Sequence, residues 1–422
     1  MEYVKFGRLG LKVSRLTFGT VSLGRLLRPT ESFRLLDEVI DTGINFIDTA
    51  DEYASGFSER IIGDWLKQNP GKRDKIVLAS KVFERVGSQP NDEGLSAYHI
   101  KRACEASLKR LQTDHLDVYQ MHHIDRHTPW PEVWQAMSQL IQEGKITYVG
   151  SSNFAAWHIA QAQAYAEQRG FLGIASEQSV YNLANRTVEL EVLPACQAMG
   201  IAFLAYSPLQ DGLLAGALSK TKPVADYHSP EHDAKFIGLL EQMEVIQPKI
   251  RIHPLTQFYG DFVYPKLQQK RHNIVIETIN QPLPEKHRAD YTVEVLQQTL
   301  EEFGQNLNDD EKQFFIDYGL SRDLGVQTRS TFWRSMLKLE RLRGQLERYE
   351  AMCQANNWQP AELALAWLSK QAGVTSIIIG ARTSRQLHSC ISSLNFQLDD
   401  ELIGKLNEIF PGLRPAPEAY AW

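Results

Sequence analysis

The chain has 422 residues, of which 43% are hydrophobic and 23% charged, and its formal net charge is −6. A mildly acidic sequence without a basic run offers no footprint for nucleic acid or an anionic membrane surface. The four cysteines lie far apart, and neither a signal peptide nor a membrane-spanning apolar run is visible, so we expect a cytoplasmic protein with reduced thiols.

The N-terminal residues predict a small β-hairpin around a glycine-bounded turn, Gly7-Arg8-Leu9-Gly10. Eight short apolar runs follow it: LTFG (16–19), NFID (45–48), IVLASK (76–81), LDVYQMH (116–122), ITYVGSS (146–152), GIASEQ (173–178), AFLAYS (202–207) and SIIIG (376–380). Because these runs lack polar alternation, they indicate strands that are buried on both faces, as in a parallel sheet.

Amphipathic helical patterns separate the runs. Two clear sets of apolar positions at helical spacing are Ile100, Ala103, Cys104, Ser107, Leu108 and Leu111, and Val133, Ala136, Met137, Leu140 and Ile141. Strands that alternate with such helices predict a parallel sheet covered by helices. Eight units fit a closed (β/α)₈ barrel better than a doubly wound sheet.

The spacing of the runs predicts one large insertion. Successive strand ends are separated by roughly one βα unit until Ser207, but the step to Gly380 carries about 140 residues beyond a unit of about 30. We therefore expect strands one to seven within residues 1–216, a helix-rich inserted subdomain at 217–330, and the rest of the barrel with a C-terminal tail at 331–422. Helix-like stretches near 233–246, 291–304 and 308–318 indicate that the insert folds.

Polar side chains mark the ends of consecutive predicted strands: Asp48 with Tyr53, then Lys81, then His122. Taken alone, an Asp after a strand is often a helix cap. An Asp, a Tyr, a Lys and a His together favour one chemical device, because barrel enzymes place their chemistry at these ends. A Lys ammonium lowers the pKa of a nearby phenol, Asp48 would hold Lys81 charged, and His122 would polarise the same substrate oxygen. We predict a proton donor beside a carbonyl.

The chain resembles the aldo-keto reductases. The motifs of that family occur in order as GT (19–20), DTADEY (48–53), ASK (79–81), DVYQMH (117–122), GSSNF (150–154), QSVYN (178–182), YSPLQDGLLAG (206–216) and GARTSRQ (380–386). Eight collinear motifs are specific, although each alone is weak. The resemblance covers residues 1–216 and about 331–395 and leaves the insert unmatched.

The resemblance implies hydride transfer between NADP(H) and an aldehyde or ketone, or the corresponding alcohol. Tyr53 would act as general acid/base, Lys81 and Asp48 would tune it, and His122 would orient the carbonyl. His123 is the alternative for the last role, and the motif spacing favours His122.

The resemblance also implies the cofactor ligands. They are Gly19 and Thr20 of the first motif; Ser152, Asn153 and Gln178 at the carboxamide; Tyr206 stacked on the nicotinamide; Ser207, Leu209 and Gly212 in the phosphate loop; and Gly380, Arg382 and Gln386 at the adenosine 2′-phosphate. The alternatives are a core aromatic for Tyr206 and a solvated surface arginine for Arg382. NADP(H) is favoured by Arg382, and NAD(H) is not excluded, because Ser389 and Cys390 replace the Glu and Asn usual near the adenine.

Several interpretations stay open. The insert is either a lid that selects the substrate or a packing or oligomer surface. Within it, His228 and His232 flank Pro230, which disfavours the helical spacing that a pair of metal ligands would need, so we predict no metal. The expected partner is a small carbonyl or alcohol, with a homo-oligomer left open. The rival functions are a cofactor-binding sensor or regulatory partner subunit, as in channel β-subunits, and a redox-neutral enzyme with tightly bound NADP⁺.

Overall fold

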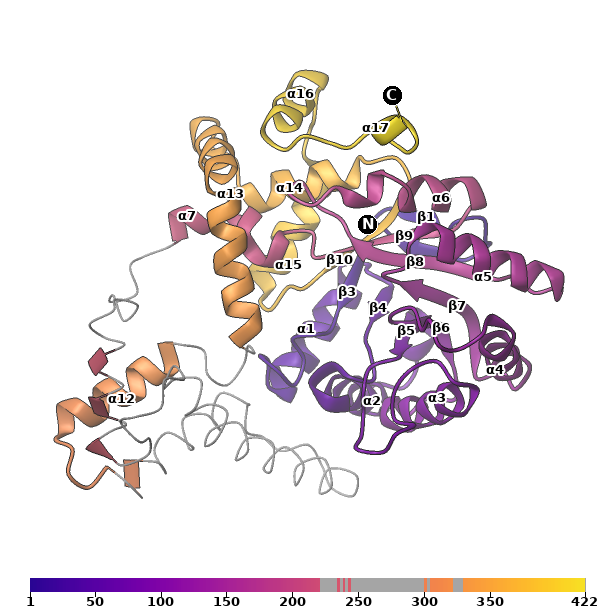
Figure 1. Cartoon of the computed structure of the whole chain (residues 1–422), viewed down its shortest axis with the longest axis horizontal. Coiled ribbons are helices and arrows are strands. Elements are labelled where there is room, and N and C mark those ends of the chain that lie inside the picture. Colours follow the sequence, from indigo (N-terminus) through magenta and orange to yellow (C-terminus); the bar gives the residue numbers. More distant parts are fainter. Residues whose placement is uncertain are drawn as a thin grey trace. The chain divides into compact units, whose positions relative to one another are not determined.

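The eight apolar runs form eight parallel strands. The computed structural model describes residues 1–220, 304–321 and 329–421, together with residues 234–235, 238–239, 242–243 and 300–301. The strands are β3 (Leu16–Gly19), β4 (Phe46–Asp48), β5 (Val77–Val82), β6 (Leu116–Met121), β7 (Ile146–Ser152), β8 (Ile174–Val180), β9 (Ala202–Tyr206) and β10 (Val374–Ile379). They pair in chain order, and β10 closes the barrel between β9 and β3. The predicted (β/α)₈ barrel is confirmed (Figure 1).

The N-terminal hairpin is also confirmed. Strand β1 (Tyr3–Lys5) pairs antiparallel with β2 (Lys12–Ser14). Phe6 and Val13 at this hairpin are fully buried and belong to one apolar cluster with barrel residues such as Phe46, Val77 and Ala202. Because Val77 and Ala202 begin their strands, the hairpin packs at the N-terminal end of the barrel, opposite the strand ends that carry the polar residues.

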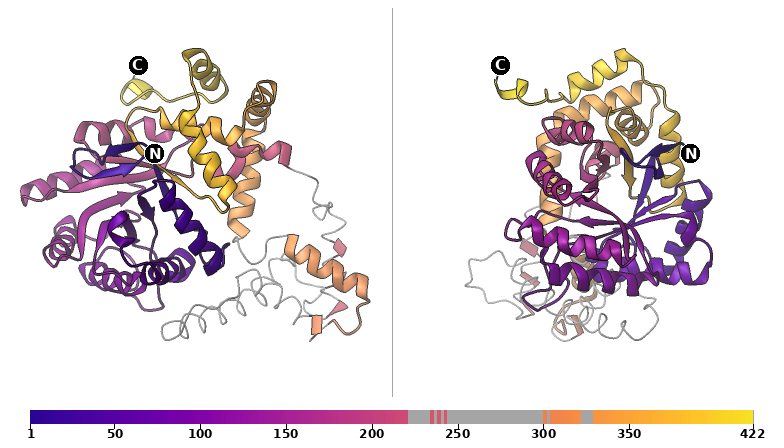
Figure 2. Two further views of the ribbon diagram at one scale, coloured as in Figure 1. Left: turned by 180° about the vertical axis from the view of Figure 1, so that it is seen from behind. Right: turned by 90° about the vertical axis from the view of Figure 1, so that its right-hand side faces the viewer.

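Helices follow the strands and surround them (Figures 1 and 2). In chain order, the helices of the described residues are α1 (Pro29–Asp41), α2 (Phe57–Gln68), α3 (Ala97–Leu111), α4 (Trp130–Gln142), α5 (Ala156–Gln168), α6 (Val192–Met199), α7 (Ala217–Lys220), α12 (Asp309–Ser321), α13 (Arg329–Ala355), α14 (Pro360–Ser369), α15 (Ser384–Ser392), α16 (Asp400–Ile409) and α17 (Glu418–Ala421). Helix α12 belongs to a separate compact unit and is not one of the helices of the barrel unit. Within this described part of the chain, no helix has the length and apolar character needed to cross a bilayer.

The predicted apolar faces of α3 and α4 are buried with one exception. All six predicted positions of α3 are buried. On α4, Val133, Met137 and Leu140 are buried, but Ile141 is 41% exposed. Ile141 lies one residue before the end of the helix and at the edge of the apolar stripe, so it does not face the barrel.

The chain divides into two compact units. One comprises Met1–Leu218 with Leu342–Trp422 and contains the barrel, and the other comprises Ser219–Arg341. The predicted helix at 308–318 corresponds to α12, whereas 291–304 and 233–246 fall mostly outside the described residues. Most of the predicted subdomain at 217–330, including His228 and His232, also lies outside them, so its boundaries stay a prediction.

Candidate active site

The strand register brings the predicted polar residues to one end of the barrel. Asp48 is the last residue of β4, and Lys81 is the penultimate residue of β5. Where β5 pairs with β6, Lys81 lies beside Gln120, and where β7 pairs with β8, Ser152 lies beside Gln178. The side chains of Asp48, Lys81 and Gln120 are buried, and Asp48 accepts hydrogen bonds from both of the others, so the three converge at this end of the barrel.

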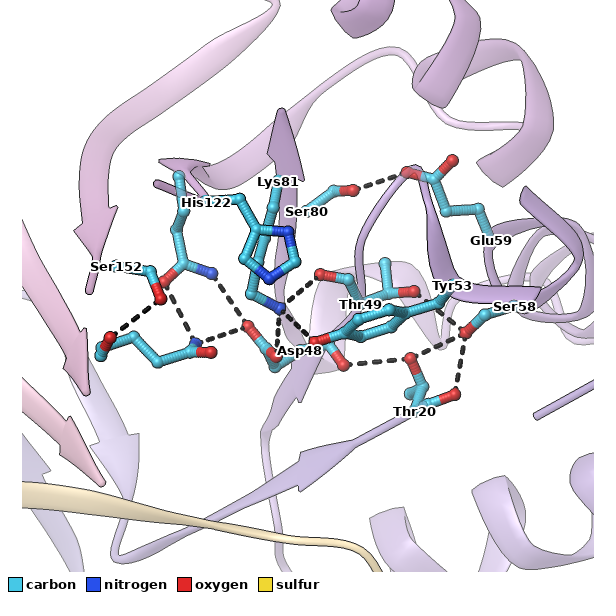
Figure 3. Close-up of polar contacts among 12 residues, drawn as sticks. Thr20, Asp48, Thr49, Tyr53, Ser58, Glu59, Ser80, Lys81, His122 and Ser152 are labelled. Carbon is cyan, nitrogen blue, oxygen red and sulfur yellow. Dashed lines mark hydrogen bonds and ion pairs between the residues drawn. The ribbon is translucent and has the colours of Figure 1, made fainter. Parts of the chain in front are cut away.

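Lys81 forms hydrogen bonds to three other groups of the site. Its Nζ lies 2.6 Å from Asp48 Oδ2, 2.8 Å from the carbonyl oxygen of Thr49 and 3.0 Å from Tyr53 Oη (Figure 3). The side chains of Lys81 and Asp48 are 0% and 2% exposed. The ammonium therefore places its three donors on a carboxylate, a carbonyl and a phenol in a water-poor environment.

The pKa of Lys81 is raised above its ordinary value. Burial lowers the pKa, but the charge of Asp48 and the hydrogen bonds to Asp48 and Tyr53 together outweigh it. Lys81 is therefore a cation at neutral pH, as the sequence predicts.

The pKa of Tyr53 is raised as well, and here the predicted direction was wrong. Burial is the largest influence and raises the pKa, and the negative charge of Asp48 adds to it. Lys81 lowers the pKa of Tyr53, as expected, but does not compensate for the loss of water around the phenol. Tyr53 therefore holds its proton at neutral pH.

A tight turn positions Tyr53 after the strand. The residue begins a short 3₁₀ helix, Tyr53–Gly56, in which Ala54 and Ser55 have φ of 51° and 59°. Gly56 ends the turn with φ of 87°, and a Cβ there would come within 2.9 Å of the Arg110 side chain. Tyr53 stands at the start of this turn, with its Oη 3.0 Å from Lys81 Nζ.

Of the two adjacent histidines, His122 lies at the site. The centroid of its ring is 6.0 Å from that of Tyr53 in an edge-on arrangement, and His123 stacks on its other side at 5.3 Å. Burial, with the positive charge of Lys81, lowers the pKa of His122 to about 2, so the ring is neutral. His123 instead lies 3.3 Å from Glu84 through Nε2 and is 42% exposed. The geometry favours His122 over His123.

The residues predicted at the carboxamide form one hydrogen-bonded group. Ser152 Oγ donates to the backbone carbonyl of Gln178 at 2.8 Å, and Asn153 Nδ2 donates to Ser152 Oγ at 3.0 Å. Tyr206 Oη donates to Asn153 Oδ1 at 2.8 Å. Burial raises the pKa of Tyr206 to about 12, so it acts as a neutral donor.

Gly19 and Thr20 have structural roles at the base of the site. A Cβ at Gly19 would come within 2.7 Å of Ile378, so glycine permits the close approach of β3 and β10. Thr20 Oγ1 donates to the carbonyl of Asp48 at 3.0 Å and accepts from Ser58 Oγ at 2.8 Å. These bonds hold the strand end that carries Asp48.

The segments predicted for phosphate and adenosine follow neighbouring strands. Ser207, Leu209 and Gly212 come after β9, and Gly380, Arg382 and Gln386 come after β10, which pairs with β9. Gly212 has φ of 93°. Arg382 is exposed, and its backbone N–H donates to Gln386 Oε1 at 2.8 Å. Both segments therefore begin at the ends of adjacent strands. The side-chain amide of Gln386 is hydrogen-bonded to the backbone of Arg382 in the same segment.

Sequence reasoning missed two buried polar residues, Gln120, which bonds to Asp48, and Asp51, which lies between Asp48 and Tyr53 in the chain. Gln120 Nε2 donates to Asp48 Oδ1 at 2.8 Å. The carboxyl group of Asp51 is buried, and neither oxygen has a hydrogen-bond partner that meets normal geometry within the described residues. Strand alternation would have found Gln120, since it lies two residues before His122 and on the same face of its strand. The DTADEY motif contains Asp51 but gives no sign of its burial.

Among the described residues, no group of three or more His, Cys, Asp or Glu side chains is arranged to hold a metal ion.

Comparisons with known proteins agree with this architecture. Residues 15–410 match the family described as the aldo/keto reductase family. The chain is 36% identical over 432 residues to the uncharacterized oxidoreductase YrpG of Bacillus subtilis (strain 168), with both chains covered in full. It is 38% identical over 228 residues to a probable voltage-gated potassium channel subunit beta of Oryza sativa subsp. japonica, covering 54% of this chain and 69% of that protein. It is 34% identical over 238 residues to versiconal hemiacetal acetate reductase of Aspergillus parasiticus, covering 51% of this chain and 69% of that protein. With a matching barrel, collinear motifs and nearly the whole chain covered, this protein belongs to the aldo/keto reductase family and is an oxidoreductase.

Proposed function

We propose that this protein interconverts an aldehyde or ketone and the corresponding alcohol with NADP(H), and that Tyr53 is its general acid/base. The observation that carries the proposal is the position of Lys81, whose Nζ joins Asp48 Oδ2 at 2.6 Å to Tyr53 Oη at 3.0 Å. NADPH, when bound, supplies the hydride that the carbonyl carbon receives.

Tyr53 supplies the proton to the carbonyl oxygen. Because the pKa of Tyr53 is raised by burial, the phenol is protonated before reaction. The phenolate left after donation is stabilised by the Lys81 hydrogen bond, and Asp48 keeps Lys81 charged and in place. In the direction of alcohol oxidation the same phenolate would accept the proton.

His122 is suited to polarise the carbonyl without taking part in proton transfer. With a pKa of about 2 its imidazole is neutral, and its Nδ1 is buried without a partner among the described residues. A neutral imidazole donates one hydrogen bond, which suits an oxygen that gains negative charge during reduction.

The donor and acceptor set fits a nicotinamide cofactor. The amide of Gln178 and the side chains of Ser152 and Asn153 lie at adjoining strand ends and offer the chemistry that a carboxamide requires. The exposed guanidinium of Arg382 suits a 2′-phosphate and supports NADP(H) over NAD(H).

A sensor or regulatory partner subunit is the second candidate function. The relative from Oryza sativa, described as a probable channel subunit beta, supports it. A redox-neutral enzyme that retains NADP⁺ is the third. The buried triad of Asp48, Lys81 and Tyr53 favours turnover, because a chain that only bound nucleotide would need no buried proton donor.

The test is the rate of NADPH consumption with a reactive aromatic aldehyde, measured for the wild type and for Tyr53→Phe, with NADH in parallel. The proposal requires turnover by the wild type, loss of about 10²–10⁴-fold in the variant, and preference for NADPH. Saturable NADPH binding with no turnover by the wild type would favour the sensor instead.

A further inference from the structure

Gln120 is a fully buried side chain that links two parts of the site. Its Nε2 donates to Asp48 Oδ1 at 2.8 Å, and its Oε1 accepts from Gln178 Nε2 at 3.2 Å. Gln178 Nε2 also donates to Asp48 Oδ1 at 3.0 Å. The three side chains therefore form a closed triangle next to the Lys81 ion pair.

The charge of Asp48 determines how both amides face. A carboxylate accepts hydrogen bonds and cannot donate them, so each glutamine must present its N–H end to Asp48 Oδ1. With its Nε2 directed at Asp48, Gln120 has only its carbonyl Oε1 to offer to Gln178. Both N–H groups of Gln178 are then occupied, and its Oε1 has no partner among the described residues.

We propose that Gln120 is a positioning residue that fixes the Gln178 amide with Oε1 as its free end, so that the site accepts an N–H donor there and selects the primary amide of the nicotinamide. The inference rests on the proposed function and deepens it. Without Gln120, one Gln178 N–H loses its acceptor and the amide loses a constraint on its rotation.

The packing around Gln120 leaves a defined space for its side chain. A Cβ at Gly150 would lie 2.8 Å from Gln120 Cγ and 2.7 Å from Ser176 Oγ, closer than real side chains allow. Gly150 therefore leaves the room that the Gln120 side chain occupies. Ser176 borders the same space, and its buried hydroxyl has no partner within the described part of the chain.

The test compares Gln120→Leu, Gln178→Leu and the double variant, with Ser176→Ala as the matched control. Dissociation constants are measured for NADPH and for adenosine 2′,5′-bisphosphate, which lacks the nicotinamide. We expect Gln120→Leu to raise the Kd of NADPH about tenfold, the effect of one or two lost hydrogen bonds, and to leave that of the bisphosphate within about twofold. The double variant should bind NADPH no more weakly than Gln178→Leu alone, because Gln120 acts through Gln178.

A second readout needs no cofactor. Hydrogen exchange of the glutamine side-chain amides, followed by NMR in selectively labelled protein, should be slow at Gln178 in the wild type and in Ser176→Ala, and fast in Gln120→Leu.

Three results would overturn the proposal: additive losses in the double variant, equal weakening of both probes, or unchanged exchange at Gln178 in Gln120→Leu. Failure of the wild type to bind NADPH would refute the proposed function, and the exchange measurement would still decide whether Gln120 orients Gln178.

Discussion

Replacing Asp48 by Asn tests how the buried ion pair stabilises the barrel. Asp48 accepts from Lys81 on Oδ2 and from Gln120 and Gln178 on Oδ1. Asn offers a single acceptor oxygen, so its amide nitrogen must face either the Lys81 ammonium or the two glutamine N–H groups. Removing one partner of a buried pair costs about 3–5 kcal/mol, because the other charge is left without compensation.

The pH dependence of this loss follows from the influences on Lys81. In the wild type Asp48 holds the folded pKa of Lys81 above the unfolded value, so its stabilisation is fully present below that unfolded value and unchanged between pH 6 and 9. In Asp48→Asn, burial remains and lowers the folded pKa of Lys81. The unfolded state then binds a proton that the folded state releases, and the free energy of unfolding rises with pH. The variant should therefore lose more stability at pH 6 than at pH 9.

Urea unfolding followed by tryptophan fluorescence measures this effect, since Trp65, Trp134 and Trp367 are buried in the barrel unit. Glu401→Gln is the control, because it removes a partner from an ion pair with Lys405 that is exposed on both sides. Its urea midpoint should match that of the wild type. If Asp48→Asn unfolds at the wild-type midpoint at pH 6, or loses the same stability at both pH values, the Asp48–Lys81 ion pair does not stabilise the barrel in this way.

Three further predictions concern single residues. Burial, with the charge of Glu59, raises the pKa of Asp51 well above its ordinary value, so the contribution of Asp51 to stability is present below its unfolded pKa and is lost as pH rises through its folded pKa. In thermal melts, the stability of Asp51→Asn should therefore increase relative to the wild type as pH rises from 5 to 8. A constant difference between the two melting temperatures would contradict this. The pKa of His122 is about 2, so below a pH of about 6.5 the unfolded state takes up a proton at this residue while the folded state does not. Thermal melts should show the wild type losing stability relative to His122→Asn as pH falls from 7 to 5. The same pH dependence of stability in both proteins would contradict a neutral His122 ring. Arg382→Ala should raise KM for NADPH about tenfold or more through loss of a charged hydrogen bond and leave KM for NADH unchanged, whereas equal effects on both cofactors would mean that Arg382 is only a surface residue.

The barrel could be predicted from the sequence because its strands are short, apolar and regularly spaced. The register of parallel strands then places Asp48, Lys81 and His122 at one end, so the composition of the site follows from the topology. Ile141 shows where periodicity fails, since an apolar residue at the edge of a stripe near a helix end can face solvent.

Electrostatic balance could not be predicted in the same way. The sequence shows that Lys81 and Tyr53 are neighbours, but the pKa of Tyr53 depends on how much water the fold removes, and burial prevails over the lysine. Strand alternation places Gln120 on the same face as His122, but its role could not be predicted from that position. The sequence does not show which groups a buried glutamine bonds to, and here the partners are Asp48 and Gln178. The two predicted roles of residues 217–330, a lid over the pocket or a packing or oligomer surface, concern residues mostly outside the described part of the chain.

The decisive measurement is the turnover rate of the wild type and of Tyr53→Phe with NADPH and an aromatic aldehyde, with NADPH binding measured on both proteins. We expect the wild type to consume NADPH with the aldehyde, and the variant to bind NADPH equally well but to turn over at least about 10²-fold more slowly. Equal turnover by Tyr53→Phe would show that the phenol beside Lys81 does not supply the proton.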